Sequence, residues 1–90
     1  MLFMKIVYID PDKKEECIKK RTAGGIPEAN VKIIGEWSTI DNSRVYLVIE
    51  ADDAREILKL MHPFQSLTRD ELFPVIETEE ILKLMAATGK

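Results

Sequence analysis

Apolar residues at both alternating positions of one early segment constrain this fold more than any other feature of the chain. Residues 2–9 contain a single charged side chain, Lys5, and the run stops at Asp10-Pro11. Such a β-branched and aromatic run is typical of a strand, and apolar residues on both of its sides indicate that both sides are buried. The sequence therefore predicts a strand whose two faces are both covered by other parts of the structure.

The remaining chain alternates helix and strand signals. Asp10 can cap a helix at residues 12–22, with Pro11 at the first helical position. Further strands are expected at residues 31–40, 44–51 and 71–77, and Asp41-Asn42-Ser43 between the second and third favours a hairpin.

Two more helices are expected in the second half of the chain. Asp52-Asp53 can cap a helix that ends before Pro63, since the residue preceding a proline is disfavoured in helical geometry. A last helix is capped by Thr78. The expected packing residues are Ala54, Ile57, Leu58 and Met61 on the first of these helices and Ile81, Leu82 and Met85 on the second.

This order predicts an α+β fold with one ferredoxin-like domain over residues 1–90: a βαββαβ antiparallel sheet with an extra C-terminal helix. The strand order in such a sheet is 4-1-3-2, which places the fourth strand at an edge. Pro74 lies in that strand, and proline is tolerated at edges rather than in central strands.

The alternation along each strand divides the sheet residues into two sets. The first set is almost purely apolar: Met4, Ile6, Tyr8, Val31, Ile33, Gly35, Trp37, Val45, Leu47, Ile49, Leu72, Pro74 and Ile76. We expect the helices to cover the face formed by this set, although exchanging the two faces leaves the argument unchanged. The second set is still about half apolar: Phe3, Lys5, Val7, Ile9, Lys32, Ile34, Glu36, Tyr46, Val48, Glu50, Phe73, Val75 and Glu77.

A monomer would expose the large apolar side chains of the second set as one patch. Soluble monomers seldom expose a patch of several hundred Å². We therefore expect a homodimer formed through this sheet face, which makes a dimeric α+β barrel.

Composition excludes several classes of partner. Thirteen Lys and Arg against sixteen Asp and Glu give a net charge of -3, which argues against a nucleic-acid partner. One cysteine permits no internal disulfide, and no signal peptide or apolar run long enough for a bilayer is present. The expectation is a cytoplasmic protein with no membrane partner.

Four stretches resemble one known family: MLFM (1–4), IPEANVKIIGEW (26–37), VIEADD (48–53) and FPVIETEE (73–80). It is a small prokaryotic family with a domain of unknown function, in the dimeric α+β barrel superfamily. The resemblance implies a ferredoxin-like subunit paired through its sheet and implies no established activity. The wider superfamily includes cofactor-free monooxygenases, muconolactone isomerase-like enzymes, haem-degrading enzymes and stress-responsive proteins, so fold alone does not assign chemistry.

Four polar or charged residues of the second set form the main candidate site: Lys5, Glu36, Tyr46 and Glu50. With a three-residue hairpin loop, Glu36 falls opposite Val48 and diagonal to Glu50. Two carboxyl groups this close would raise one pKa and make an acid/base pair, whose charge Lys5 can offset. The alternative is a salt-bridge cluster with a structural role only.

His62 and Cys17 are weaker candidates. His62 is the only histidine and lacks the companion spacing of a metal site, so we expect no metal; its alternative role is a helix C-terminal residue favoured by the dipole. Basic neighbours can lower the pKa of Cys17, although no base partner is visible, and the alternative is a half-buried helix contact.

These residues lead to a hypothesis of small-molecule binding by a homodimer, without metal or organic cofactor. The expected ligand-binding residues are Trp37, Tyr46, Glu50 and Lys5. The alternative is a small cofactor-independent isomerase or monooxygenase-like enzyme that uses Glu36, Glu50 or His62 for proton transfer. A third possibility is a protein-interaction module, which would contain no cavity.

Overall fold

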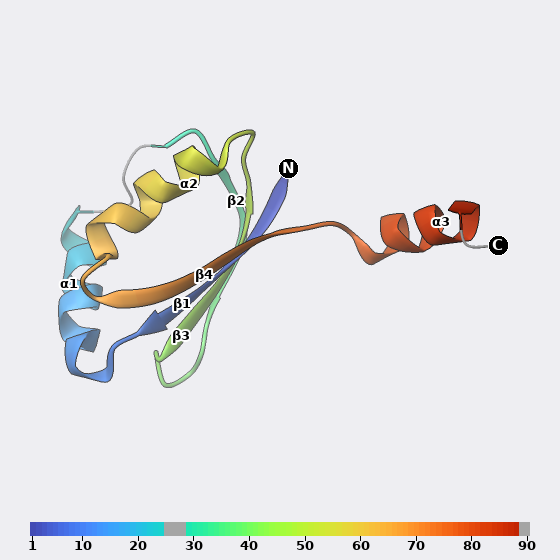
Figure 1. The fold of residues 1–90 in the computed structure, drawn as a ribbon. Helices are drawn as coiled ribbons and strands as arrows, with labels where there is room; N and C mark the ends of the chain where they lie inside the picture. Colours follow the sequence, from blue (N-terminus) through green and yellow to red (C-terminus); the bar gives the residue numbers. More distant parts are fainter. Residues whose placement is uncertain (25–28, 89–90) are drawn as a thin grey trace.

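The computed structural model describes residues 1–24 and 29–88, and within them four strands form one antiparallel sheet in the order β2-β3-β1-β4. The strands are β1 (Leu2–Ile9), β2 (Lys32–Ser38), β3 (Arg44–Glu50) and β4 (Thr68–Val75). Helices α1 (Lys14–Gly24) and α2 (Ala54–Met61) cover one face, whereas α3 (Thr78–Thr88) extends away from the sheet (Figure 1). This α+β arrangement is compatible with a ferredoxin-like fold. The expected strand order, with Pro74 in an edge strand, is confirmed.

Short polar side chains start the helices as expected. Asp10 accepts a hydrogen bond from the Asp12 amide at the start of a 3-10 turn, Pro11–Lys13, which leads into α1. Asp53 caps α2 by accepting from the Arg55 amide at 2.9 Å. The Arg55 guanidinium also binds this carboxylate and is the main reason that the pKa of Asp53 falls to about 2. These caps satisfy amide groups that a helix start leaves without partners.

The core lies between α2 and the covered face of the sheet. Ile49 of β3 and Ile57 of α2 are completely buried, and around them pack Phe3, Val45, Leu47, Ala51 and Leu60. Leu60 belongs to the packing side of α2, whereas Leu58, which we expected there, is 54% exposed. The side of α2 that packs on the sheet therefore lies part of a turn away from the predicted side.

The assignment of faces is wrong for β1, and for Gly35 and Trp37 of β2, which pair with Val48 and Tyr46 of the open face. In the observed register Phe3 lies opposite Ile49 and Lys5 lies opposite Leu47, so the covered face holds Phe3, Lys5, Val7 and Ile9 of that strand. Met4, Ile6 and Tyr8 share the open face with Tyr46 and Val48. Alternation sorts residues within one strand, but only the register relates the faces of two strands.

Other differences arise at element ends. Strand β2 is shorter than expected, and β4 spans Thr68–Val75 rather than residues 71–77. His62 keeps helical angles before Pro63, because the chain tightens there into a 3-10 turn, His62–Phe64, instead of leaving the helix abruptly. On α3, the expected packing residues Ile81, Leu82 and Met85 are 40%, 59% and 62% exposed. None of the helices in the described ranges is long and apolar enough to cross a bilayer.

Replacement of Ile57 by alanine tests where the core lies. Ile57→Ala should lower the free energy of unfolding by about 3 kcal/mol, because it removes a completely buried side chain and leaves a cavity. Leu58→Ala, one position along the same helix, should change it by less than about 1 kcal/mol, because that side chain is mostly exposed. Urea denaturation of both variants measures the difference. Equal losses would contradict the observed orientation of α2.

Candidate functional site

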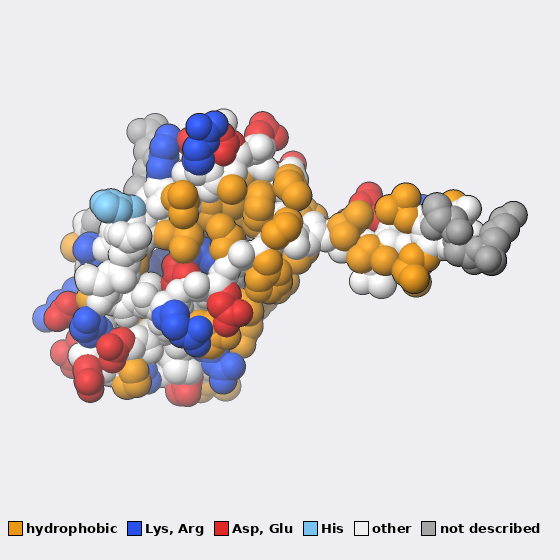
Figure 2. Space-filling view, in the orientation of Figure 1, with side chains coloured by type: hydrophobic (Ala, Val, Ile, Leu, Met, Phe, Trp, Pro, Cys, Tyr) orange, Lys and Arg blue, Asp and Glu red, His pale blue; other side chains and the backbone are white. Residues whose placement is uncertain are grey.

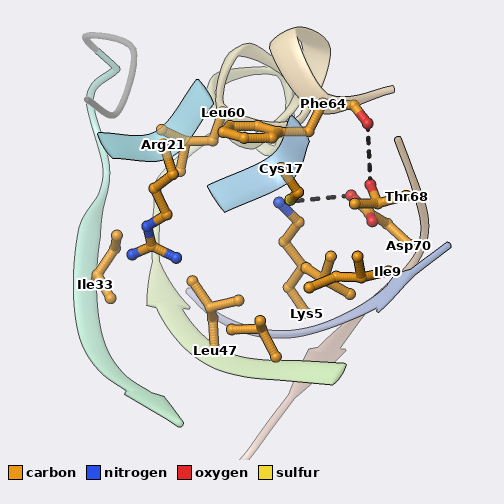
Figure 3. Close-up of a pocket in the computed structure, with 12 residues that line it drawn as sticks. Lys5, Ile9, Cys17, Arg21, Ile33, Leu47, Leu60, Phe64, Thr68 and Asp70 are labelled. Atoms are coloured by element: carbon orange, nitrogen blue, oxygen red, sulfur yellow. Dashed lines mark hydrogen bonds and ion pairs between the residues drawn. The ribbon is translucent and has the colours of Figure 1, made fainter. Parts of the chain in front are cut away.

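A pocket of about 80 Å³ lies between α1, α2 and the covered face of the sheet. Its wall is mainly apolar and includes Val7, Leu47, Leu60 and Phe64. Charged and polar side chains enter it from three elements: Lys5 from β1, Cys17 and Arg21 from α1, and Thr68 and Asp70 from β4 (Figure 3). An apolar pocket with a few converging polar groups is the usual form of a small-molecule site.

Lys5 and Asp70 form a buried ion pair at the centre of this pocket (Figure 3). Their side chains are 9% and 8% exposed, and Nζ of Lys5 lies 3.6 Å from Oδ2 of Asp70. Burial lowers the pKa of Lys5, and the charge of Asp70 opposes that change. This distance is longer than a direct hydrogen bond, so the two groups attract each other by charge. Each can still form a shorter hydrogen bond with another group.

Asp70 has an unused acceptor. Its Oδ1 atom is buried and has no hydrogen-bond partner among the residues that the structure describes. Buried polar atoms in folded proteins are nearly always paired, and an exception points to a water molecule or a ligand. Asp70 therefore brings an unsatisfied acceptor to the wall of the pocket.

A second ion pair joins α1 to β2 beside the pocket. The Arg21 guanidinium donates from both terminal nitrogens to the two carboxylate oxygens of Glu36, with Nη2 at 2.6 Å from Oε1. This hydrogen bonding raises the pKa of Arg21. Because Arg21 lines the pocket, the pair fixes one wall of it.

Cys17 enters the pocket from α1, half-buried. The sequence suggested that basic neighbours lower its pKa. That expectation is wrong: burial raises the pKa of the thiol, and the opposing effect of Arg21 is smaller. The side chain is a helix contact that contributes polarizable surface to the pocket.

The structure divides the predicted group of four residues between the two faces. Lys5 and Glu36 belong to the covered face, whereas Tyr46 and Glu50 belong to the open face. The register of the β2–β3 hairpin causes this: Ser38 pairs with Val45 rather than with Tyr46, so Glu36 falls opposite Leu47 rather than Val48. Glu36 and Glu50 are thus not the close carboxyl pair that we expected.

Trp37 and Tyr46 lie opposite one another on the open face, away from the pocket. Trp37 is 62% exposed, and its indole packs over Gly35 so closely that a Cβ there would overlap the ring. Of the predicted ligand-binding residues, Lys5 alone lines the pocket. A binding role for Trp37, Tyr46 and Glu50 stays a prediction about the open face.

His62 lies exposed at the C-terminal end of α2, outside the pocket lining. No group of three or more His, Cys, Asp or Glu side chains within residues 1–24 and 29–88 is placed to hold a metal ion.

Sequence reasoning missed Asp70 and the role of Arg21. Asp70 was overlooked because the fourth strand was expected to begin at residue 71, one position too late to place it opposite Val7 of β1. The available signal was Lys5, a charged residue in an otherwise apolar strand, because a buried lysine needs an acidic partner such as Asp70 on a neighbouring strand. Arg21 carried no such signal, since its helix presents basic residues on several sides.

Comparison with known proteins gives a family and no activity. A search of curated proteins found no match. The family model of a domain of unknown function, DUF3303, matches residues 1–89, which is nearly the whole chain. The chain therefore belongs to the DUF3303 family.

Proposed function

We propose that this protein is a homodimeric α+β barrel that binds a small molecule in the pocket around Lys5 and Asp70, without metal or organic cofactor. The observation that carries the proposal is the buried Oδ1 atom of Asp70, which lacks a partner among the described residues. An unpaired buried acceptor is costly to the fold, so a ligand that supplies a donor there gains both a hydrogen bond and selectivity.

The pocket favours a particular ligand chemistry. Its apolar wall suits a hydrocarbon or aromatic body, and its volume of about 80 Å³ suits a small group. One polar group of the ligand would donate to Asp70 and accept from Lys5, as a hydroxyl group does. Nζ of Lys5 lies 3.6 Å from Oδ2 of Asp70, so a hydroxyl group that donates to the neighbouring Oδ1 would also lie beside the ammonium group.

A cofactor-independent isomerase or monooxygenase-like enzyme is the second candidate, and the same ion pair favours it. Burial lowers the pKa of Lys5, which makes its ammonium group a better proton donor to a bound substrate. The carboxylate of this candidate is Asp70. Glu36 is bound by Arg21, and Glu50 and His62 are exposed outside the pocket.

The open face of the sheet supports the homodimer. Large side chains from all four strands lie there half-buried or exposed in the single chain, with the helices on the opposite face: Met4, Ile6, Tyr8, Trp37, Tyr46, Val48, Phe73 and Val75. A second sheet packed on this face would remove them from water, at about 25 cal/mol per Å² before the cost of association.

The buried ion pair should behave as a unit in stability measurements. Lys5→Met alone should cost about 3 kcal/mol at neutral pH, because it leaves the Asp70 carboxylate buried without its partner. Lys5→Met together with Asp70→Leu should come within about 1 kcal/mol of the unaltered protein, because no buried charge remains. Thermal denaturation of both variants tests this, and additive losses would contradict the pairing.

The same double variant tests the binding site. Phenol, benzyl alcohol and cyclohexane serve as probes, with chemical shifts of backbone amides as the readout. We expect the two hydroxyl compounds to move the amides of Lys5, Cys17 and Asp70 and to bind at least about tenfold more weakly to the double variant, through loss of hydrogen bonds to charged groups. Cyclohexane, which lacks the hydroxyl, is the control and should bind both proteins alike. Unchanged hydroxyl binding in the folded double variant would refute the site.

The homodimer has its own test in Val48, at the centre of the open face. Val48→Glu should weaken self-association at least about 100-fold, because a carboxylate would be buried between two sheets without a partner. Ile40→Glu makes the same change in charge at a fully exposed hairpin residue and should leave association unchanged. Sedimentation equilibrium measures both. An unaltered protein that stays monomeric at high concentration would refute the dimer.

A further inference from the structure

Helix α3 is an apolar arm that its own domain leaves uncovered. It begins shortly after β4 ends and runs away from the sheet (Figure 1). Its Ile81, Leu82 and Met85 side chains are 40%, 59% and 62% exposed. An isolated helix of 11 residues is only marginally stable in water, so α3 needs a surface to pack against.

The arm continues the apolar surface of the open face. Phe73 and Val75 on β4 belong to that face, and the next residue, Ile76, is 47% exposed. Hydrophobic side chains gather where the chain leaves the body and reappear along the arm (Figure 2). Whatever covers the open face at β4 therefore also reaches the beginning of α3.

The open face alone is small for the interface of a stable dimer. Four strands of seven or eight residues make a rectangle of roughly 24 Å by 19 Å, or about 450 Å² in outline. Stable interfaces bury about 800 Å² per partner. An 11-residue helix is about 16 Å long and about 10 Å wide. If each subunit packs its own α3 on the partner and also contacts the partner's α3, the buried area per subunit comes closer to about 800 Å².

Charge favours a second copy of this chain as the partner. The first turn of α3 carries Glu79 and Glu80. Arg44 and Arg69 both lie opposite Tyr8, at the end of the sheet remote from α3, where Arg69 also forms an ion pair of 3.9 Å with Glu71. If two sheets pack with their strands antiparallel, this basic end of one copy comes beside the acidic start of the other copy's arm.

We propose that α3 is an exchanged arm, which packs its Ile81, Leu82 and Met85 side chains on the second copy of this chain. The inference rests on the homodimer proposed above. Twofold symmetry requires that each subunit give and receive one arm, so both exposed helices are covered at once. The arm adds contact area to the dimer and orders α3 only when the partner is bound.

A charge-matched pair of variants tests the arm. Leu82→Glu with Met85→Glu adds two negative charges on the apolar side, and Lys83→Glu makes an equal change in charge on the same helix. We expect the double variant to weaken the dimer at least 30-fold in sedimentation equilibrium and Lys83→Glu to weaken it less than threefold. A double variant that dimerises as well as Lys83→Glu overturns the arm while the sheet dimer stands; an unaltered protein that is monomeric overturns both.

A direct contact measurement complements the variants. In a sample that mixes isotope-labelled and unlabelled copies of the full chain, the methyl group of Met85 should show nuclear Overhauser contacts to the other copy. Contacts of Met85 confined to its own copy would overturn the proposal even if the dimer forms.

Discussion

The structure depends on one imbalance: the sheet is apolar on both faces, and its helices cover only one. On the covered face, α2 buries Ile57 against Ile49 and completes the core. The open face keeps Tyr46 and Val48 half-buried and Trp37 exposed in the single chain. Helix α3 does not cover that face and extends away from the sheet (Figure 1). Removal of this apolar surface from water is the driving force that we assign to self-association.

The Lys5–Asp70 pair is the more deeply buried of the two ion pairs at the covered face. A hydrophobic pair of similar size in this place would often be as stable or more stable, because two charges lose their hydration on burial. Its presence beside a pocket, with an acceptor of Asp70 unused, is more easily explained by binding than by stability. The two faces thus have separate roles in the proposed function, one for the ligand and one for the partner.

Local signals in the sequence predicted the order of the elements well. Asp10 caps the 3-10 turn that leads into α1, Asp53 caps α2, and Pro74 lies in an edge strand, because each effect depends on a few neighbouring residues. Thr78, which we expected to cap α3, is instead its first residue. The candidate site was predicted less well, since it depends on relations between strands. Alternation did not reveal that Lys5 shares a face with Leu47 rather than Tyr46, or that the hairpin register pairs Glu36 with Leu47. Asp70 was missed for the same reason, as its partner is distant in sequence.

Trp37 provides the most direct measurement of the central claim, since it is the single tryptophan and lies on the open face. Acrylamide quenching of its fluorescence can be followed as the protein is diluted from high micromolar to nanomolar concentration. If two sheets cover each other, quenching should be weak in the concentrated sample and should rise on dilution toward that of the exposed indole of the single chain. Strong quenching that stays the same at every concentration would contradict the account.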